Sequence, residues 1–129
     1  MADRALRTCL LLGFWLPLAI CTYMAFAPHP PDAVFRISDV VLHGFAFTYL
    51  TFALCLAHPA PRWWLPGLWM LGYGASIEVV QMFEVERSAE LKDLMVDLLG
   101  ILTGLAAARA LGPWTRATAR AVLVRLLPG

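Results

Sequence analysis

Carboxylate, imidazole and amide side chains occur in pairs within the apolar part of this chain. The pairs are Asp39 with His43, Glu78 with Gln81, and Asp93 with Asp97. In a helix, a spacing of three or four residues places both members of a pair on one face, about one turn apart. A carboxylate beside an imidazole can form an oriented acid–base pair, and several carboxylates together can hold a divalent cation. These residue types therefore fit acid–base chemistry, cation binding or recognition of a polar ligand.

Four apolar runs, three of which carry these pairs, predict four membrane-spanning helices. They cover residues 8–27, 39–57, 63–83 and 91–111. The first has twenty residues, about the length that ~30 Å of hydrocarbon requires. Proline-rich or charged segments separate the runs, as expected where a chain leaves the membrane and turns back. We predict an all-α membrane protein with a single domain over residues 1–129, surrounded by lipid and without a nucleic-acid partner.

The overall composition favours the same fold class. Hydrophobic residues make up 60% of the chain and charged residues only 15%, with a mean hydropathy of +0.71. A soluble domain of this length needs more charge to cover its surface. The composition therefore predicts an exterior that faces lipid.

The distribution of basic residues predicts the orientation in the membrane. If the N-terminus is cytoplasmic, seven arginines lie on that side: Arg4, Arg7, Arg62, Arg109, Arg116, Arg120 and Arg125. Three basic residues then lie outside: Arg36, Arg87 and Lys92. Because short cytoplasmic loops are enriched in Lys and Arg, both termini are predicted to be cytoplasmic, with the polar pairs at the outer side.

The two ends of the chain leave alternatives open. Arg4 and Arg7 before an apolar run also fit a secretory signal peptide, but the run exceeds the usual core of ~7–15 residues, so we expect a retained helix. Residues 114–127 are too short and too basic to span a bilayer. They predict either an amphipathic helix along the headgroups or a frayed basic end.

The polar pairs must avoid the hydrocarbon. An ionisable side chain there costs about 2.5–3.5 kcal/mol on insertion scales, so we expect these groups to face one another or a water-filled pocket. Glycines share their helical faces: Gly74 precedes Glu78, and Gly100 with Gly104 follows Asp97. Such small residues let helices approach closely. A purely structural network, with Gln81 as an interhelical hydrogen bond, is the alternative to a functional pocket.

At these residues the sequence resembles the VanZ-like family, small membrane proteins named for a teicoplanin-resistance protein. The resemblance covers residues 39 to about 107. Its motifs are D-x-x-x-H at residues 39–43, G-x-x-I-E-x-x-Q at residues 74–81, a loop arginine at Arg87, and D-x-x-x-N-x-x-G-x-x-x-G at residues 93–104. Two positions depart from the pattern, since Asp97 replaces the common Asn and Val40 replaces a frequent Lys. The predicted pocket is therefore more negative than is usual in the family.

The resemblance implies a four-helix protein of the bacterial cytoplasmic membrane, linked to the cell envelope and to glycopeptide susceptibility. It does not supply an agreed biochemical activity. We expect the protein to bind or modulate an envelope component, such as a lipid-linked wall precursor or a glycopeptide. The predicted ligand-binding residues are Asp39, His43, Glu78, Gln81, Arg87, Asp93 and Asp97.

Two other classes of function stay open. An intramembrane hydrolase or transferase acting on a lipid-linked phosphate would use His43, Asp39 and Glu78 as candidate catalytic groups. A divalent cation, which the sequence does not require, would then bind Glu78, Asp93 and Asp97. A proton relay is the third class. The cytoplasmic halves of the helices carry almost no polar residues, so only a homo-oligomer assembled through Gly100 and Gly104 would complete a path.

Overall fold

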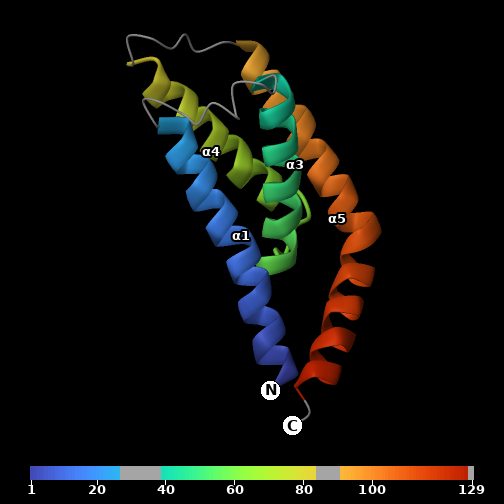
Figure 1. Cartoon of the computed structure of the whole chain (residues 1–129). Helices are drawn as coiled ribbons and strands as arrows, with labels where there is room; N and C mark the ends of the chain where they lie inside the picture. Colours follow the sequence, from blue (N-terminus) through green and yellow to red (C-terminus); the bar gives the residue numbers. More distant parts are fainter. Residues whose placement is uncertain (27–38, 84–90, 128–129) are drawn as a thin grey trace.

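The computed structural model of this chain consists of α-helices (Figure 1). The structure describes residues 1–26, 39–83 and 91–127, and for residues 39, 40 and 91–93 it describes only the backbone. The helices are α1 (Ala2–Phe26), α3 (Asp39–Ala57), α4 (Leu65–Gln81) and α5 (Leu91–Leu126). No strand occurs in these described ranges. The predicted all-α class is confirmed.

The helix boundaries follow the predicted runs at most points. Helix α3 has the predicted bounds, and α4 lies inside the run predicted at 63–83, with Pro66 in its first turn. Proline is tolerated there because the first backbone N–H groups of a helix have no intrahelical partner. Helix α1 begins six residues before residue 8, at Ala2.

Helix α5 extends beyond the apolar run predicted at residues 91–111. It continues through Pro113 to Leu126, so residues 114–126 are helical, as one of the two alternatives for the tail had it, and they are continuous with the fourth helix rather than frayed. The Arg116 guanidinium donates to the main-chain carbonyls of Cys55 and Leu56 at the end of α3. This contact holds the turn after Pro113 in place, and the Ala- and Arg-rich sequence beyond it favours a helix.

A core of apolar side chains lies between the helices, with α3 packed most extensively against α5. The most deeply buried members come from every helix: Phe14, Leu50, Met70 and Ile101. Two interhelical hydrogen bonds add to this packing. The Thr22 and Tyr73 hydroxyl oxygens lie 2.8 Å apart, and the Tyr49 hydroxyl donates to the Gly13 carbonyl at 2.8 Å. Helix α1 is thereby joined to α3 and α4 rather than standing apart from the bundle.

The outer surface is strongly apolar. Within the part of the chain that the structure describes, two helical stretches are long and apolar enough to cross a membrane, Ala2–Phe26 and Leu94–Leu126, and a shorter apolar stretch covers Val41–Ala57. In the most apolar 18-residue part of each long stretch, 11% is buried inside the protein for Ala2–Phe26 and 28% for Leu94–Leu126. The core helix of a soluble protein would be mostly buried, so these two helices are candidate membrane spans.

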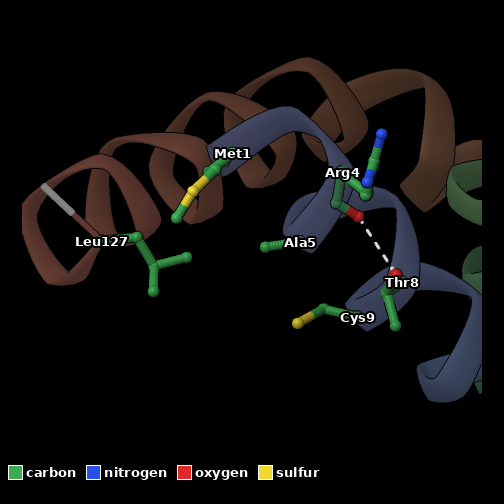
Figure 2. Close-up of a pocket in the computed structure, with 6 residues that line it drawn as sticks. All are labelled: Met1, Arg4, Ala5, Thr8, Cys9 and Leu127. Carbon is green, nitrogen blue, oxygen red and sulfur yellow. Dashed lines mark hydrogen bonds between the residues drawn. The ribbon is translucent and has the colours of Figure 1, made fainter. Parts of the chain in front are cut away.

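The two termini lie at the same end of the bundle, where α1 and α5 converge (Figure 1). Arg120 donates to the Asp3 carboxylate at 2.7 Å, which joins the two helices near their ends. An open cavity of about 710 Å³ lies at this end of the bundle (Figure 2). Met1, together with Ala5 and Cys9 of α1, turns toward the same space as Leu127.

Candidate functional site

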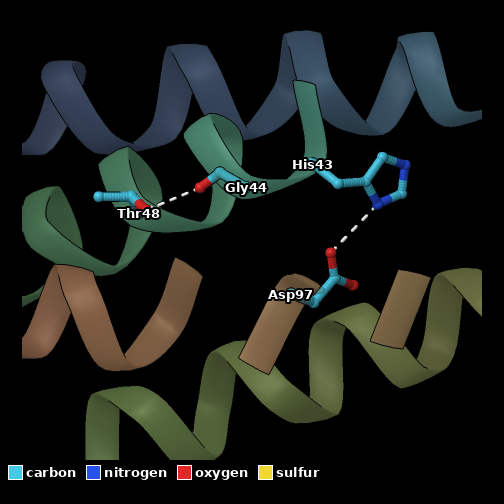
Figure 3. Close-up of polar contacts among 4 residues, drawn as sticks. All are labelled: His43, Gly44, Thr48 and Asp97. Atoms are coloured by element: carbon cyan, nitrogen blue, oxygen red, sulfur yellow. Dashed lines mark hydrogen bonds and ion pairs between the residues drawn. The ribbon is translucent and has the colours of Figure 1, made fainter. Parts of the chain in front are cut away.

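A histidine and an aspartate from different helices meet near the end of the bundle opposite the termini. The Nδ1 atom of His43 on α3 lies 3.1 Å from Oδ1 of Asp97 on α5 (Figure 3). The Asp97 side chain is 2% exposed and that of His43 is 31% exposed. A buried carboxylate requires a compensating partner, and the imidazole N–H supplies it. The chain thus brings together two residues that are 54 positions apart.

Helix α4 closes one side of this pair through a glycine. A Cβ atom added to Gly74 would lie 2.9 Å from Oδ2 of Asp97 and 3.0 Å from Cζ of Phe47. A larger residue would therefore displace the Asp97 carboxylate and the Phe47 ring from these positions. Gly74, predicted from its position on the polar face of its helix, is the point at which α4 approaches α3 and α5.

Phe47 supports the imidazole of His43. The two rings stack with centroids 6.5 Å apart and an angle of 25° between their planes, and Phe47 is 4% exposed. Phe47 was not among the predicted site residues. The available signal was its position four residues after His43, which places both side chains on one helical face.

Close backbone contact between α3 and α5 sets the position of Asp97. A Cβ at Gly100 would lie 2.8 Å from the Gly44 carbonyl, which also accepts a hydrogen bond from Thr48 Oγ1 at 2.7 Å (Figure 3). A Cβ at Gly104 would lie 2.6 Å from the Thr48 carbonyl. Both glycines therefore lie where α3 and α5 approach each other closely within one chain. The predicted homo-oligomer stays untested.

The two polar residues on α4 differ in what they contact. The Gln81 amide donates from Nε2 to the Ala25 carbonyl on α1 at 3.1 Å, so it makes the interhelical hydrogen bond that the sequence left open. Glu78 is half-buried one turn after Gly74, on the same face of α4. We define the polar cluster as His43, Phe47, Gly74, Glu78 and Asp97.

Three predicted ligands cannot be added to this cluster. The side chains of Asp39 and Asp93, in the first turns of α3 and α5, lie outside the described residues, as does Arg87. Within the described ranges, no group of three His, Cys, Asp or Glu side chains could hold a metal ion. The candidate cation site at Glu78, Asp93 and Asp97 includes an undescribed side chain, so it remains a prediction.

The His43–Asp97 pair has the geometry of an oriented imidazole. When Nδ1 donates to a carboxylate, the other ring nitrogen, Nε2, is the basic one, and the ring is held in a single orientation. The orienting role predicted for Asp39 is untested, because its side chain lies outside the described residues. Among the described carboxylates, that of Asp97 lies within hydrogen-bond distance of the His43 imidazole. Such a pair can accept a proton, donate one, or hydrogen-bond a polar ligand.

Comparisons with known proteins identify one family. A protein-family model described as VanZ/LLP1 matches residues 8–112. The matched range extends beyond the motifs quoted above at both ends, and it includes most of α1. No curated protein and no solved structure matches the chain.

Proposed function

The chain belongs to the VanZ/LLP1 family, and on that premise we propose that it binds a cell-envelope component at the polar cluster. The bound component is a lipid-linked wall precursor or a glycopeptide such as teicoplanin, and binding changes susceptibility to such antibiotics. One observation carries the proposal: Asp97, a carboxylate that is 2% exposed, pairs with His43 in a bundle whose exterior is apolar. Ionisable groups inside membrane bundles are by default functional.

The proposal includes a placement in the membrane. The chain spans the bacterial cytoplasmic membrane four times, with both termini in the cytoplasm and the polar cluster in the outer half. The arginine distribution supports this orientation, because the turn between α3 and α4 carries Arg62 and the tail carries Arg116, Arg120 and Arg125. Trp63, Trp64 and Trp114 lie near these arginines in the sequence, as interfacial residues commonly do.

Cysteine labelling tests this placement. In a background with alanine at the native cysteines, we expect Ser88→Cys to react with a membrane-impermeant maleimide on intact cells. Ala60→Cys, between α3 and α4, should react only after the membrane is permeabilised. The reverse pattern would place the polar cluster on the cytoplasmic side and remove the proposed access to envelope precursors.

The chemistry of the polar cluster suits a ligand with both polar and apolar parts. His43 is 31% exposed, so a ligand can reach it, whereas Asp97 acts by holding the imidazole. Phe47, stacked on His43, supplies an apolar wall beneath the ring. A lipid-linked precursor combines a hydrocarbon chain with phosphate and sugar groups, which matches a polar cluster set among apolar helices.

Native mass spectrometry of the purified protein tests binding. We expect added lipid-linked wall precursor or teicoplanin to form a one-to-one adduct with the wild type. His43→Gln and Glu78→Gln should each raise the Kd of this adduct about tenfold or more, where a factor of ten corresponds to about 1.4 kcal/mol of binding free energy. Arg125→Gln, near the exposed end of α5, serves as the control and should bind as the wild type does. Equal binding by well-folded His43→Gln protein, or none by the wild type, would refute the proposal.

A second candidate function rests on the orientation of His43 by Asp97. An imidazole held in this way can act as a general base, so the protein would hydrolyse or transfer a lipid-linked phosphate. The same samples distinguish the two functions. Conversion of the precursor by the wild type, lost in His43→Gln and dependent on a divalent cation, would favour the enzyme over the binding protein.

A further inference from the structure

A second cavity lies at the end of α3 that is remote from the polar cluster. Its volume is about 310 Å³, and its walls come from three helices: Phe14 and Trp15 of α1, Leu54 and His58 at the end of α3, and Pro66 and Trp69 of α4. His43 and His58 are separated by roughly 20 Å along the α3 axis, at a rise of about 1.5 Å per residue. This cavity is therefore distinct from the polar cluster.

The walls of the cavity are apolar and largely aromatic. Phe14 is 0% exposed and Leu54 8% exposed, whereas Trp15 is 47% and Trp69 55% exposed. The buried side chains thus lie at the base, and the two tryptophans reach the outer surface. Such a hollow, open toward the exterior of an apolar bundle, suits a flexible hydrocarbon chain.

The His58 imidazole forms part of the cavity wall. Its imidazole makes edge-to-face contacts with Phe14 and Trp15, with ring centroids 6.0 Å and 5.9 Å apart. Its main-chain N–H donates to the Leu54 carbonyl at 2.8 Å, which continues the hydrogen bonding of α3 by one residue. The end of α3 is therefore held against α1, and the cavity is a stable feature of the packing.

Positive charge lies in the turn between α3 and α4 and in the part of α5 that contacts this turn. Arg62, two residues after the wall residue Ala60, lies over the Trp64 ring at 5.9 Å, and Arg109 lies over the Trp63 ring at 5.3 Å. Residues 58–64 and 105–120 contain no Asp or Glu. Tryptophan and arginine together mark the level at which hydrocarbon meets the lipid headgroups. The cavity consequently lies just inside a basic headgroup zone.

We propose that this cavity binds one acyl chain of an anionic phospholipid, with the lipid phosphate held at Arg62. The apolar walls accept the chain, and the arginine side chain supplies the charge that distinguishes an anionic from a zwitterionic headgroup. The bound lipid fills the gap between α1, α3 and α4 at this end of the bundle. The inference rests on the membrane placement proposed above but uses no residue of the polar cluster.

Quenching of tryptophan fluorescence by brominated lipids tests this proposal. Trp63, Trp64 and Trp114 are replaced by phenylalanine, so that only Trp15 and Trp69 report. We expect saturable quenching by phosphatidylglycerol with brominated acyl chains, and at least about tenfold weaker binding of the matching phosphatidylcholine, a difference of 1.4 kcal/mol. Equal quenching by both lipids, quenching that does not saturate, or equally effective competition by sodium phosphate at matched ionic strength would overturn the proposal.

Two variants separate the headgroup from the acyl chain. Arg62→Gln should bring the affinity for phosphatidylglycerol close to that for phosphatidylcholine, whereas Arg125→Gln should leave it unchanged. Ala60→Phe, at an exposed wall position, should weaken binding of both lipids while binding of the wall precursor at the polar cluster stays as in the wild type. Unchanged quenching in Ala60→Phe would refute the lipid site and leave the proposed function standing.

Discussion

Replacing Gly104 with alanine should destabilise the folded protein by about 1–3 kcal/mol, the usual cost of overpacking a filled interior. The added Cβ would lie 2.6 Å from the Thr48 carbonyl oxygen and 2.7 Å from Cβ of Thr51, both on α3. Neither atom is the end of a flexible side chain, so the two helices must separate. The extent of unfolding in mixed micelles, measured against the fraction of SDS, gives the change in stability.

Gly72→Ala provides a matched control on α4. Apart from the neighbouring part of α4 itself, no described atom lies within 4 Å of the Cβ that this substitution would add. Alanine is favoured over glycine inside a helix by roughly 0.5–1 kcal/mol, so Gly72→Ala should be neutral or slightly stabilising. The two substitutions are chemically identical and should change stability in opposite directions. If both proteins unfolded at the same SDS fraction, the close approach of α3 and α5 would be disproved.

The second large effect is expected at Asp97. Asp97→Ala removes a carboxylate that is 2% exposed, together with its hydrogen bond to the His43 imidazole. Hydrogen bonds inside membrane bundles average about 0.6 kcal/mol and reach about 1.7 kcal/mol. We expect the His43–Asp97 bond near the upper value, because Asp97 is almost fully buried and hydrogen bonds are electrostatically stronger where water is excluded.

A double-mutant cycle isolates this bond. The stabilities of wild type, His43→Ala, Asp97→Ala and the double variant should give a coupling energy of about 0.5–2 kcal/mol. Asp97→Asn keeps an oxygen that can accept from Nδ1, so it should retain most of the stability lost in Asp97→Ala. Additive effects of the two alanine substitutions would mean that the two side chains do not interact in the folded protein.

Loss of binding should accompany the loss of this bond. Asp97 is too buried to be the main contact of a ligand, yet it orients the imidazole that a ligand can reach. In the proposed function, Asp97→Ala should therefore weaken the precursor adduct even in molecules that remain folded. This outcome distinguishes an orienting role from a purely structural one, in which folded Asp97→Ala protein would bind as well as the wild type.

The positions of the helices could be predicted largely from local sequence. Helix α3 begins and ends at the predicted residues, 39 and 57, because a continuous apolar run is bounded there by charge and proline. The end of α5 could not be predicted in this way. Pro113 and the following arginines are local signals for a boundary, but Arg116 bonds to the carbonyls of Cys55 and Leu56, about sixty residues earlier.

The candidate site was likewise predictable from local sequence only in part. Helical periodicity predicted that Gly74 and Glu78 share one face of their helix, as do Asp97, Gly100 and Gly104. The periodicity of one helix does not determine which of its faces packs against which neighbouring helix. It therefore did not predict that His43 pairs with Asp97, or that Gln81 turns to the Ala25 carbonyl of α1.

The sequence by itself determined the helical class, the apolar exterior and the residues able to do chemistry, because these depend on residue type and on spacing within one helix. Only the tertiary structure decided which residues of different helices contact one another. A contact such as that of Gly104 with Thr48 depends on how two helices cross, and the crossing results from the combined packing of side chains from all the helices. The same packing formed the cavity beside His58, whose walls come from three helices and have no common signal in the sequence.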